Sequence, residues 1–395
     1  MIPQSFIQDL VERLDITDVI GGHLSLKKRG ANYLAKCPFH NEKTPSFTVF
    51  PEKNNYHCFG CGAHGNTIGF LMEYQGITFI EAVNELADSI GLVVPSSNID
   101  NNHASNIRKE IERVLSVAMK YYERELKNSD IAINFLKNRG LTGEVAKLFN
   151  LGFAPKKANG LRSVFEDYEN NEHLVQAGLI VKAGDNKVYD RFRGRIMFPI
   201  HNSFGKVIGF GGRAIDDVPP KYLNSPETPL FNKGQELYGL FQSLDGIRKS
   251  DKIIVAEGYM DVVAMSQFDI RCVVATLGTA TSEFQVKKLL SRADNVVFAF
   301  DGDEAGRKAA WRAMLASLPI IDDGKLISFM FFPNGEDPDS FIRKHGAPAF
   351  WKSLASAEPL SEFLLREANA AVNLTSTEGK AKFLKDVKHL ISKIK

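Results

Sequence analysis

Three carboxylates late in the chain have the spacing of a metal site in a parallel α/β sheet. The apolar runs 252–256 and 295–300 read as buried strands, the first ending at Glu257 and the second at Asp301 and Asp303. Acidic side chains at the carboxyl ends of such strands point into the crevice where open α/β sheets bind ligands. The glycine between the two aspartates allows a sharp turn that aims both carboxylates at one place. Carboxylate oxygens select Mg²⁺, so this spacing predicts phosphoryl transfer or its reverse, hydrolysis.

The segments around these strands predict the sheet that positions the carboxylates. Further buried strands are expected at 271–276 and 326–332, and helices at 259–268, 281–290 and 304–318. Short apolar strands that alternate with helices indicate βαβ units and a parallel sheet. Another acidic pair, Asp337 and Asp339, closely follows the last of these strands. One acidic turn of this kind is more often a solvated surface, but three at strand ends favour a site.

A glutamate followed by glycine at one strand end, with Asp-x-Asp at another, resembles the toprim fold of primases, topoisomerases and some nucleases. The resemblance covers residues 251–333. Toprim sheets serve enzymes that make, cut or pass nucleic-acid strands. The resemblance to toprim alone therefore leaves the reaction open.

Three of the four cysteines belong to a second site with metal-ligand spacing. Two pairs of side chains, each separated by two residues, match a structural zinc site with Cys₃His ligation. The predicted ligands are Cys37, His40, Cys58 and Cys61. His57 and His64 are rival ligands, but His40 is favoured because it pairs in spacing with Cys37. Such thiols indicate a reducing compartment, since in a secreted chain they would more often form disulfides.

The residues around these ligands indicate a β ribbon with a basic and aromatic surface. Short runs at 31–36, 45–50 and 55–57 are rich in β formers. Aromatic side chains beside lysines form a platform on which single-stranded bases stack next to phosphates. The same aromatics would also fill the small core, and the sequence leaves both readings open. They are Tyr33, Phe39, Phe47 and Phe59.

Longer motifs narrow the choice among toprim enzymes. The run CPFHNEKTPSF that starts at residue 37, ahead of the toprim segment, is similar to bacterial DnaG-type replicative primases. Irregular runs at 190–200, 209–213 and 220–228 match the same family. In that family the middle of the chain forms a basic ridge that guides the template toward the toprim metals. The resemblance implies template or nucleotide contacts at Arg191, Arg213, Lys221 and Lys233.

The charge of this middle segment suits a polyanionic partner. Between Lys182 and Lys233, nine Lys or Arg oppose five Asp or Glu, whereas the whole chain has a formal net charge of +2. Arg191, Arg193 and Arg195 alternate, so on a strand they would share one face. Phosphate contacts that release counterions would relieve the repulsion among them. A merely solvated edge is the alternative.

Length and patterning predict several domains. At 395 residues the chain should hold roughly two to three. We expect an α/β multidomain fold: a β-rich zinc ribbon, a mixed α+β subdomain, a parallel toprim sheet and a helical C-terminal end. The boundaries are 1–95 (zinc ribbon), 96–106 (linker), 107–250 (N-terminal part of the catalytic core with the basic ridge), 251–335 (toprim) and 336–395 (acidic loop and helical subdomain). No signal peptide or membrane-length apolar run is evident, so we expect a bacterial cytoplasmic location and no membrane partner.

The DnaG resemblance implies a template-directed RNA polymerase that starts short RNA primers on single-stranded DNA from ribonucleoside triphosphates. Glu257, Asp301 and Asp303 would hold two catalytic Mg²⁺ ions, for which Mn²⁺ substitutes, and one structural Zn²⁺ would occupy the N-terminal site. The expected supporting acids are Asp261, Asp337 and Asp339.

Partners and alternatives follow from the same resemblance. The replicative helicase is an expected partner, but the family's C-terminal helicase-binding domain is expected to be absent, because residues 358–395 read only as helices of a further subdomain. A toprim nuclease or topoisomerase-like enzyme is the alternative, although no separate tyrosine-nucleophile domain is evident. A non-enzymatic zinc module for single-stranded DNA is disfavoured by the acids at the strand ends.

Overall fold

The computed structural model describes residues 2–40, 42, 44–75, 77, 79–92, 94–95, 100–184, 187–278 and 280–394. The chain forms two compact units, Met1–Ser105 and Asn106–Lys395. Residues 96–99 of the predicted linker lie outside the described residues, and helix α5 (Asp100–Lys127) begins earlier than the predicted start at residue 107. No helix among the described residues has the length and apolar character needed to cross a membrane.

The N-terminal unit is an antiparallel sheet covered by short helices. Its strands, in spatial order, are β1 (Lys27–Arg29), β2 (Asn32–Ala35), β3 (Phe47–Phe50), β4 (Asn55–Cys58) and β5 (His64–Gly65). The helices are α1 (Gln4–Arg13), α2 (Ile16–Gly21), the 3₁₀ turn η1 (Pro51–Lys53), α3 (Thr67–Gln75) and α4 (Phe79–Ser89). Strand alternation buries Phe47 and Val49 on the inner face, where Phe47 stacks on Tyr56 at 4.9 Å between ring centroids.

The second unit begins with α5 and a mixed subdomain. Its helices are α6 (Asp130–Asn138), α7 (Gly143–Leu148), η2 (Gly160–Ser163), α8 (Glu172–Gln176) and α9 (Leu240–Ser250). Its main sheet is antiparallel in the order β11 (Tyr222–Asn224), β10 (Val207–Ala214), β9 (Arg195–His201) and β6 (Gly152–Ala154), and β7 (Ile180–Ala183) pairs with β8 (Lys187–Asp190). Every residue of β9 and β10 is buried, so these two strands are the centre of the subdomain.

The third sheet carries the acidic residues. Its order is β13 (Val273–Ala275), β12 (Lys252–Ala256), β14 (Asn295–Phe300), β15 (Leu326–Phe331) and β16 (Glu358–Pro359). The first four strands are parallel, and β16 adds one antiparallel edge. The connecting helices are α10 (Tyr259–Gln267), α11 (Glu283–Leu290) and α12 (Glu304–Ser317), followed by α13 (Pro338–Ala355). The predicted parallel sheet is confirmed.

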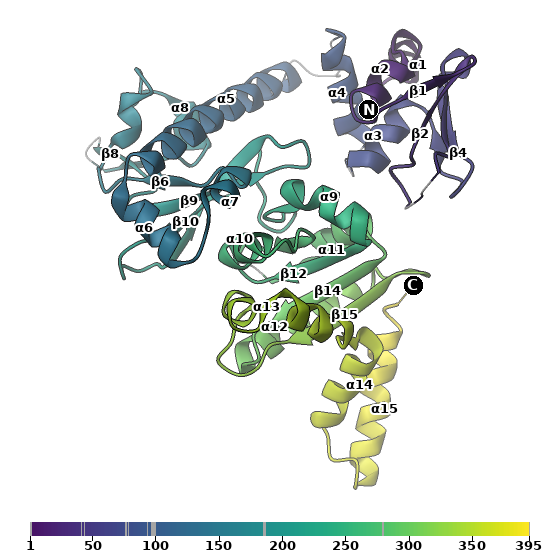
Figure 1. Ribbon diagram of the computed structural model, residues 1–395, viewed down its shortest axis with the longest axis vertical. Helices are drawn as coiled ribbons and strands as arrows, with labels where there is room; N and C mark the ends of the chain where they lie inside the picture. Colours follow the sequence, from purple (N-terminus) through teal and green to yellow (C-terminus); the bar gives the residue numbers. More distant parts are fainter. Residues whose placement is uncertain are drawn as a thin grey trace. The chain divides into compact units, whose positions relative to one another are not determined.

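A helical hairpin closes the chain. Helix α14 (Leu360–Ala370) packs on β15, and α15 (Thr377–Ile391) packs on α14. Figure 1 shows the two helices running side by side beyond the sheet, in yellow. The predicted α/β multidomain fold, from zinc ribbon to helical end, is confirmed.

Candidate active site and metal centres

The acidic residues follow the strands at which the order of the parallel sheet reverses. From β12 the chain moves to β13 on one side and then returns past β12 to β14 on the other. Right-handed crossovers of this kind send α10 and α12 to opposite faces of the sheet. The crevice between β12 and β14 is therefore the switch point where such sheets bind ligands. Glu257 directly follows β12, and Asp301 directly follows β14.

Three of the acids also begin helices. The carboxylate of Asp303 accepts a hydrogen bond from the Gly306 amide at 2.7 Å, and Asp337 accepts one from the Ser340 amide at 2.7 Å. Asp261 accepts from the Gly258 amide at 3.0 Å. Each cap orients its carboxylate and directs the positive end of α12, α13 or α10 toward the cluster. Sequence reasoning missed these caps, although an acidic residue at a helix start is their usual signal.

The carboxylates perturb one another electrostatically. Burial raises the pKa of Asp301 to about 6, and the charges of Glu257 and Asp337 add to this effect. The Glu257 side chain reaches solvent, yet loss of water around it, together with the charge of Asp303, raises its pKa. Burial and the charge of Asp337 raise the pKa of Asp261 well above its ordinary value. Mutual repulsion of this kind is relieved when a cation binds.

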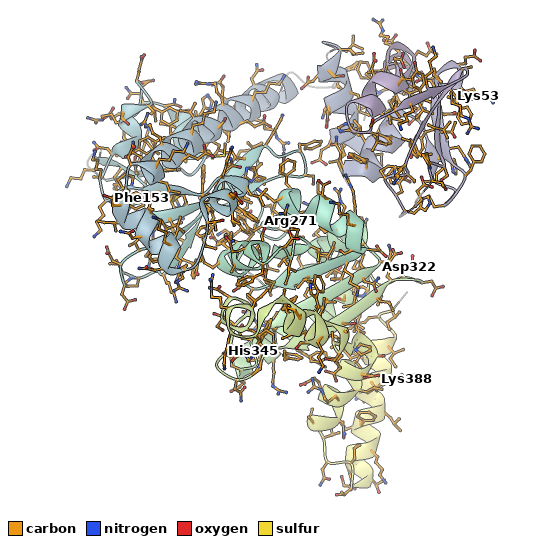
Figure 2. The ribbon with its side chains drawn as sticks, viewed as in Figure 1. Lys53, Phe153, Arg271, Asp322, His345 and Lys388 are labelled. Atoms are coloured by element: carbon orange, nitrogen blue, oxygen red, sulfur yellow. The ribbon has the colours of Figure 1, made fainter. Side chains whose placement is uncertain are left out.

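Asp339 is committed to ion pairs. It is buried, and its carboxylate pairs with the Nε atom of Arg343 at 2.5 Å and with Arg139 at 3.9 Å. The loop before it is held by Glu336, which pairs with Lys344 at 2.6 Å and with His345, labelled in Figure 2, at 3.3 Å. The Asp339 carboxylate is therefore occupied by two arginines, unlike the carboxylates of Glu257 and Asp301.

The donor set of the cluster fits Mg²⁺. Among the described residues, only the Cys/His group discussed next brings three or more potential ligand atoms within 4.8 Å of one another. The carboxylates are therefore more widely spaced than ligands of a closed site. Mg²⁺ keeps several waters and is usually held by one or two carboxylates plus substrate phosphates. An open set of carboxylate oxygens suits that coordination.

The N-terminal ligands form a compact quartet. The Sγ atoms of Cys37 and Cys61 are 3.8 Å apart, and Cys58 Sγ is 3.6 Å from His40 Nδ1. Tetrahedral zinc with bonds of about 2.3 Å to sulfur and 2.0–2.1 Å to nitrogen requires separations of roughly 3.8 and 3.6 Å. The quartet therefore has the dimensions of a Cys₃His zinc site. The rival His64 instead contacts the Gly62 carbonyl through Nδ1 at 2.9 Å.

A second layer of contacts orients these ligands. Glu42 accepts hydrogen bonds from the Cys37 amide at 2.6 Å and the Ser46 amide at 3.0 Å, and its other oxygen lies 3.4 Å from His40 Nε2. A carboxylate behind Nε2 directs Nδ1 toward a metal. Gly60 leaves the necessary space, because a Cβ atom there would lie 2.6 Å from His40 Nε2.

The thiols show why the quartet needs a cation. Burial would raise the pKa of Cys58, but hydrogen bonds from Ser46 and from the amide of Cys61 outweigh it and lower this pKa to about 7. At Cys37, burial and the neighbouring Cys58 raise the pKa. Three adjacent thiolates are stable only with a positive ion between them.

The basic residues differ from the predicted pattern. Arg191, Arg193 and Arg195 do not share a strand face, because Gly194 has φ +61° and β9 begins only at Arg195. Arg195 is buried and donates to the carbonyls of Gly212 and Lys221. Arg193 is exposed over the Tyr189 ring. The prediction of a single arginine face is wrong.

The other basic candidates lie in distinct environments. Arg191 donates to the Asn224 carbonyl through Nε at 3.3 Å and Nη2 at 3.2 Å. Arg213 is only 4% exposed and lies over the rings of Phe135 and Tyr222, and its Nε and Nη1 atoms have no hydrogen-bond partner among the described residues. The Lys221 side chain is exposed, and that of Lys233 is partly buried.

The structure also divides the aromatic residues of the N-terminal unit. Phe47 is fully buried, whereas Phe59 is 70% exposed and its ring lies 4.7 Å from that of His57. Phe39 contacts the core rings, with its centroid 6.0 Å from that of Phe47. Lys53, labelled in Figure 2, lies over the Phe50 ring. Phe59 is therefore the best placed of these residues to stack with a partner.

Four family models match the chain. They are described as CHC2 zinc finger (residues 2–102), DNA primase catalytic core, N-terminal domain (121–244), Toprim-like (254–342) and DnaB-helicase binding domain of primase (361–395). The expected absence of a helicase-binding domain is therefore wrong. The amphipathic pattern of α14 and α15 indicates only a helical subdomain, because helical periodicity does not identify a binding partner.

Full-length relatives and solved structures agree with these matches. The chain is 47% identical to the DNA primase of Neisseria meningitidis serogroup A over 402 residues, which cover 100% of this chain and 68% of that protein. It is 48% identical to the DNA primase of Pseudomonas aeruginosa, covering 61% of that protein. The DnaG primase catalytic domain bound to ssDNA matches with a TM-score of 0.69 and 39% identity, over 73% of this chain and 94% of that one. The Aquifex aeolicus primase (zinc binding and RNA polymerase domains) matches with a TM-score of 0.63 and 33% identity, over 98% and 92%.

Proposed function

Because this chain belongs to the bacterial DnaG-type DNA primases, we propose that the acidic residues at the β12–β14 crevice are the metal-binding centre of primer synthesis. As a DNA primase, the protein is a nucleotidyltransferase that synthesises short RNA primers on single-stranded DNA for replication. The observation that carries the proposal is that Glu257 and Asp301 follow the two strands that meet at the switch point. Burial and the charge of Glu257 raise the pKa of Asp301, and burial and the charge of Asp303 raise the pKa of Glu257.

Each acid has a separate role in this proposal. Glu257, Asp301 and Asp303 bind two Mg²⁺ ions, which Mn²⁺ can replace. When bound, the ions would act as Lewis acids that activate the primer 3′ hydroxyl, and their positive charge would offset the negative charge of the triphosphate. Asp261 and Asp337 hold the helix starts around the ions, again supported by their capping hydrogen bonds. The N-termini of α10, α12 and α13 add positive partial charge toward the phosphates.

The basic residues bind the template and nucleotide in this proposal. The Nε and Nη1 atoms of the buried Arg213 have no acceptor among the described residues, and an anionic phosphate would provide one. Lys221 and Lys233 offer single positive charges to the template backbone, and Arg191 shapes the β11 end through its bonds to Asn224. The Cys37, His40, Cys58 and Cys61 quartet holds one structural Zn²⁺, as its dimensions indicate.

The remaining assignments concern partners and place. Residues 361–395 contribute to binding the replicative helicase, on the strength of their match to the primase helicase-binding domain. A DNA primase of bacteria works in the cytoplasm, where DNA is replicated.

The test is an assay with single-stranded template, four ribonucleotides and Mg²⁺, scored for primers and for template cleavage. Glu257→Gln keeps the side-chain shape but removes a charge from the site. We expect primer yield to fall at least about 100-fold, as when a transition-state contact is lost, with template affinity unchanged. Calorimetric Mg²⁺ binding should weaken in parallel. Normal priming by this variant would show that the catalytic centre lies elsewhere, and cleavage in place of primers would favour the nuclease alternative.

A further inference from the structure

One buried side chain connects the parallel sheet to the basic loop that carries Lys233. Gln285 lies in the first turn of α11 and is 0% exposed. Its Nε2 atom donates to the carbonyls of Lys233 and Glu236, both at 2.9 Å. Its Oε1 atom accepts from the Ser282 amide at 3.1 Å. Every hydrogen-bonding group of this amide is therefore used.

Helix capping alone does not explain a glutamine at this position. The capping box needs only a side-chain oxygen that accepts from the Ser282 amide, which a glutamate supplies equally well. The amide nitrogen is what the loop requires, because two backbone carbonyls converge on it. A carboxylate would place negative charge against both carbonyls and leave them unpaired.

Other contacts fix the same loop. The Ser282 hydroxyl donates to the Gly234 carbonyl. Lys288, one turn further along α11, pairs with Glu236 at 2.8 Å, with both side chains 19% exposed. On its other side, the Lys233 amide donates to the Glu227 carboxylate at 3.1 Å. The backbone of Lys233 is thus held from two directions.

The Lys233 side chain is left available by this arrangement. Among the described residues its ammonium group has no ion-pair partner. Fixing the backbone of a long, flexible lysine removes part of the entropy that phosphate binding would otherwise cost. Helix α11 itself packs on β14 and α12, so its contacts with the loop fix the position of the loop relative to the sheet that carries Asp301.

We propose that Gln285 is a positioning residue that holds the 233–236 loop so that Lys233 engages a phosphate of the template strand. This inference rests on the proposed role of Lys233 in template binding. Gln285 touches neither template nor metal and acts through the loop.

The test is a double-mutant cycle on the full chain, with single-stranded DNA affinity measured over a range of salt. Lys233→Ala should reduce the magnitude of the negative slope of log affinity against log salt by about 0.7, the value for one lost single-strand phosphate contact. Gln285→Met, which changes no charge, should also reduce the magnitude of this slope. The double variant should match Lys233→Ala alone. Lys287→Met, on the exposed side of α11, is the control and should be additive with Lys233→Ala.

The outcomes separate the two proposals. If Lys233→Ala does not change the slope, the proposed phosphate contact of Lys233 is refuted, and the positioning role of Gln285 is refuted with it. A normal effect of Lys233→Ala with strict additivity of Gln285→Met overturns the positioning role alone. If Gln285→Met does not fold, Glu236→Gln tests whether the loop must be held for Lys233 to bind, since it removes the ion pair of the loop with Lys288. Loss of its negative charge would strengthen DNA binding by electrostatics, so weaker binding supports positioning and unchanged or stronger binding refutes it.

Discussion

Replacing Glu42 with glutamine removes a negative charge from behind the zinc quartet and keeps the shape of the side chain. The glutamine oxygen still accepts from the amides of Cys37 and Ser46, so the backbone at these two residues keeps both hydrogen bonds. The other oxygen becomes an NH₂ group that faces His40 Nε2, now 3.4 Å from a carboxylate oxygen. Since Nδ1 faces the metal position, Nε2 carries the proton, and two donors would then oppose each other.

The same oxygen also accepts a hydrogen bond from the Ser46 hydroxyl at 2.5 Å, so the size of the effect follows from this bond and from the contact with His40. A hydrogen bond to a charged group contributes about 1.5–3 kcal/mol, which corresponds to roughly 10- to 150-fold in an equilibrium constant. Loss of a carboxylate behind a histidine ligand typically costs about 10- to 100-fold in metal affinity. We therefore expect Glu42→Gln to bind zinc about 10- to 100-fold more weakly and to retain one zinc per chain when zinc is in excess.

Competition with a calibrated chelator measures this change. Glu52→Gln, an exposed charge removal on η1, is the matched control and should keep wild-type zinc affinity. Cys61→Ser should lose most of the zinc. Zinc affinity of Glu42→Gln within about twofold of wild type, beside a defective Cys61→Ser, would refute the claim that the carboxylate orients His40.

Three further changes test other parts of the molecule. Gly306→Ala would stabilise an ordinary helix, but here its Cβ would clash with the Asp301 carbonyl, so thermal stability and primer yield should both fall. The control Ala305→Ser should leave both unchanged. A Gly306→Ala variant that is more stable and fully active would contradict this reasoning. Lys221→Ala should reduce the magnitude of the slope of log template affinity against log salt by about 0.7 for every template sequence. An unchanged slope would show that Lys221 is only a solvent-exposed charge. Burial lowers the pKa of His201 to about 4, so between its ordinary value of 6.5 and pH 4 unfolding takes up a proton and stability falls as pH falls. His201→Gln should remove about 1.4 kcal/mol per pH unit of that slope, measured by denaturation at pH 5 and pH 7.

The strands and their terminal acids were predictable because they depend on local patterns. Apolar runs fixed the positions of β12 and β14, and the parallel sheet then brought Glu257 and Asp301 to one edge without further information. The pairing of ligands within two-residue spacings likewise pointed to His40, and the structure brings that side chain beside Cys58.

What the sequence did not reveal depends on contacts between distant segments. The arginine alternation misled because Gly194 interrupts the strand and turns Arg195 into the interior. Gln285 gives no motif of its own, since its partners at Lys233 and Glu236 are far away in the chain. A predicted strand face or an exposed charge is therefore a weaker inference than a residue at a strand end.

The helix N-termini around the acidic cluster imply that the catalytic Mg²⁺ and the structural Zn²⁺ differ in how readily they dissociate from the protein. Amide groups at the N-termini of α10, α12 and α13 already offset part of the anionic charge, and the sheet beneath them has a large apolar core. A Mg²⁺ ion held there would be exchangeable, and its supply would set the rate of priming without determining the stability of the fold. Zinc, in contrast, belongs to the small N-terminal unit as a permanent part, because folding and metal binding are coupled in such modules. Chelators of graded strength should accordingly stop synthesis reversibly at low strength and unfold only the N-terminal unit at high strength, as followed by hydrogen exchange.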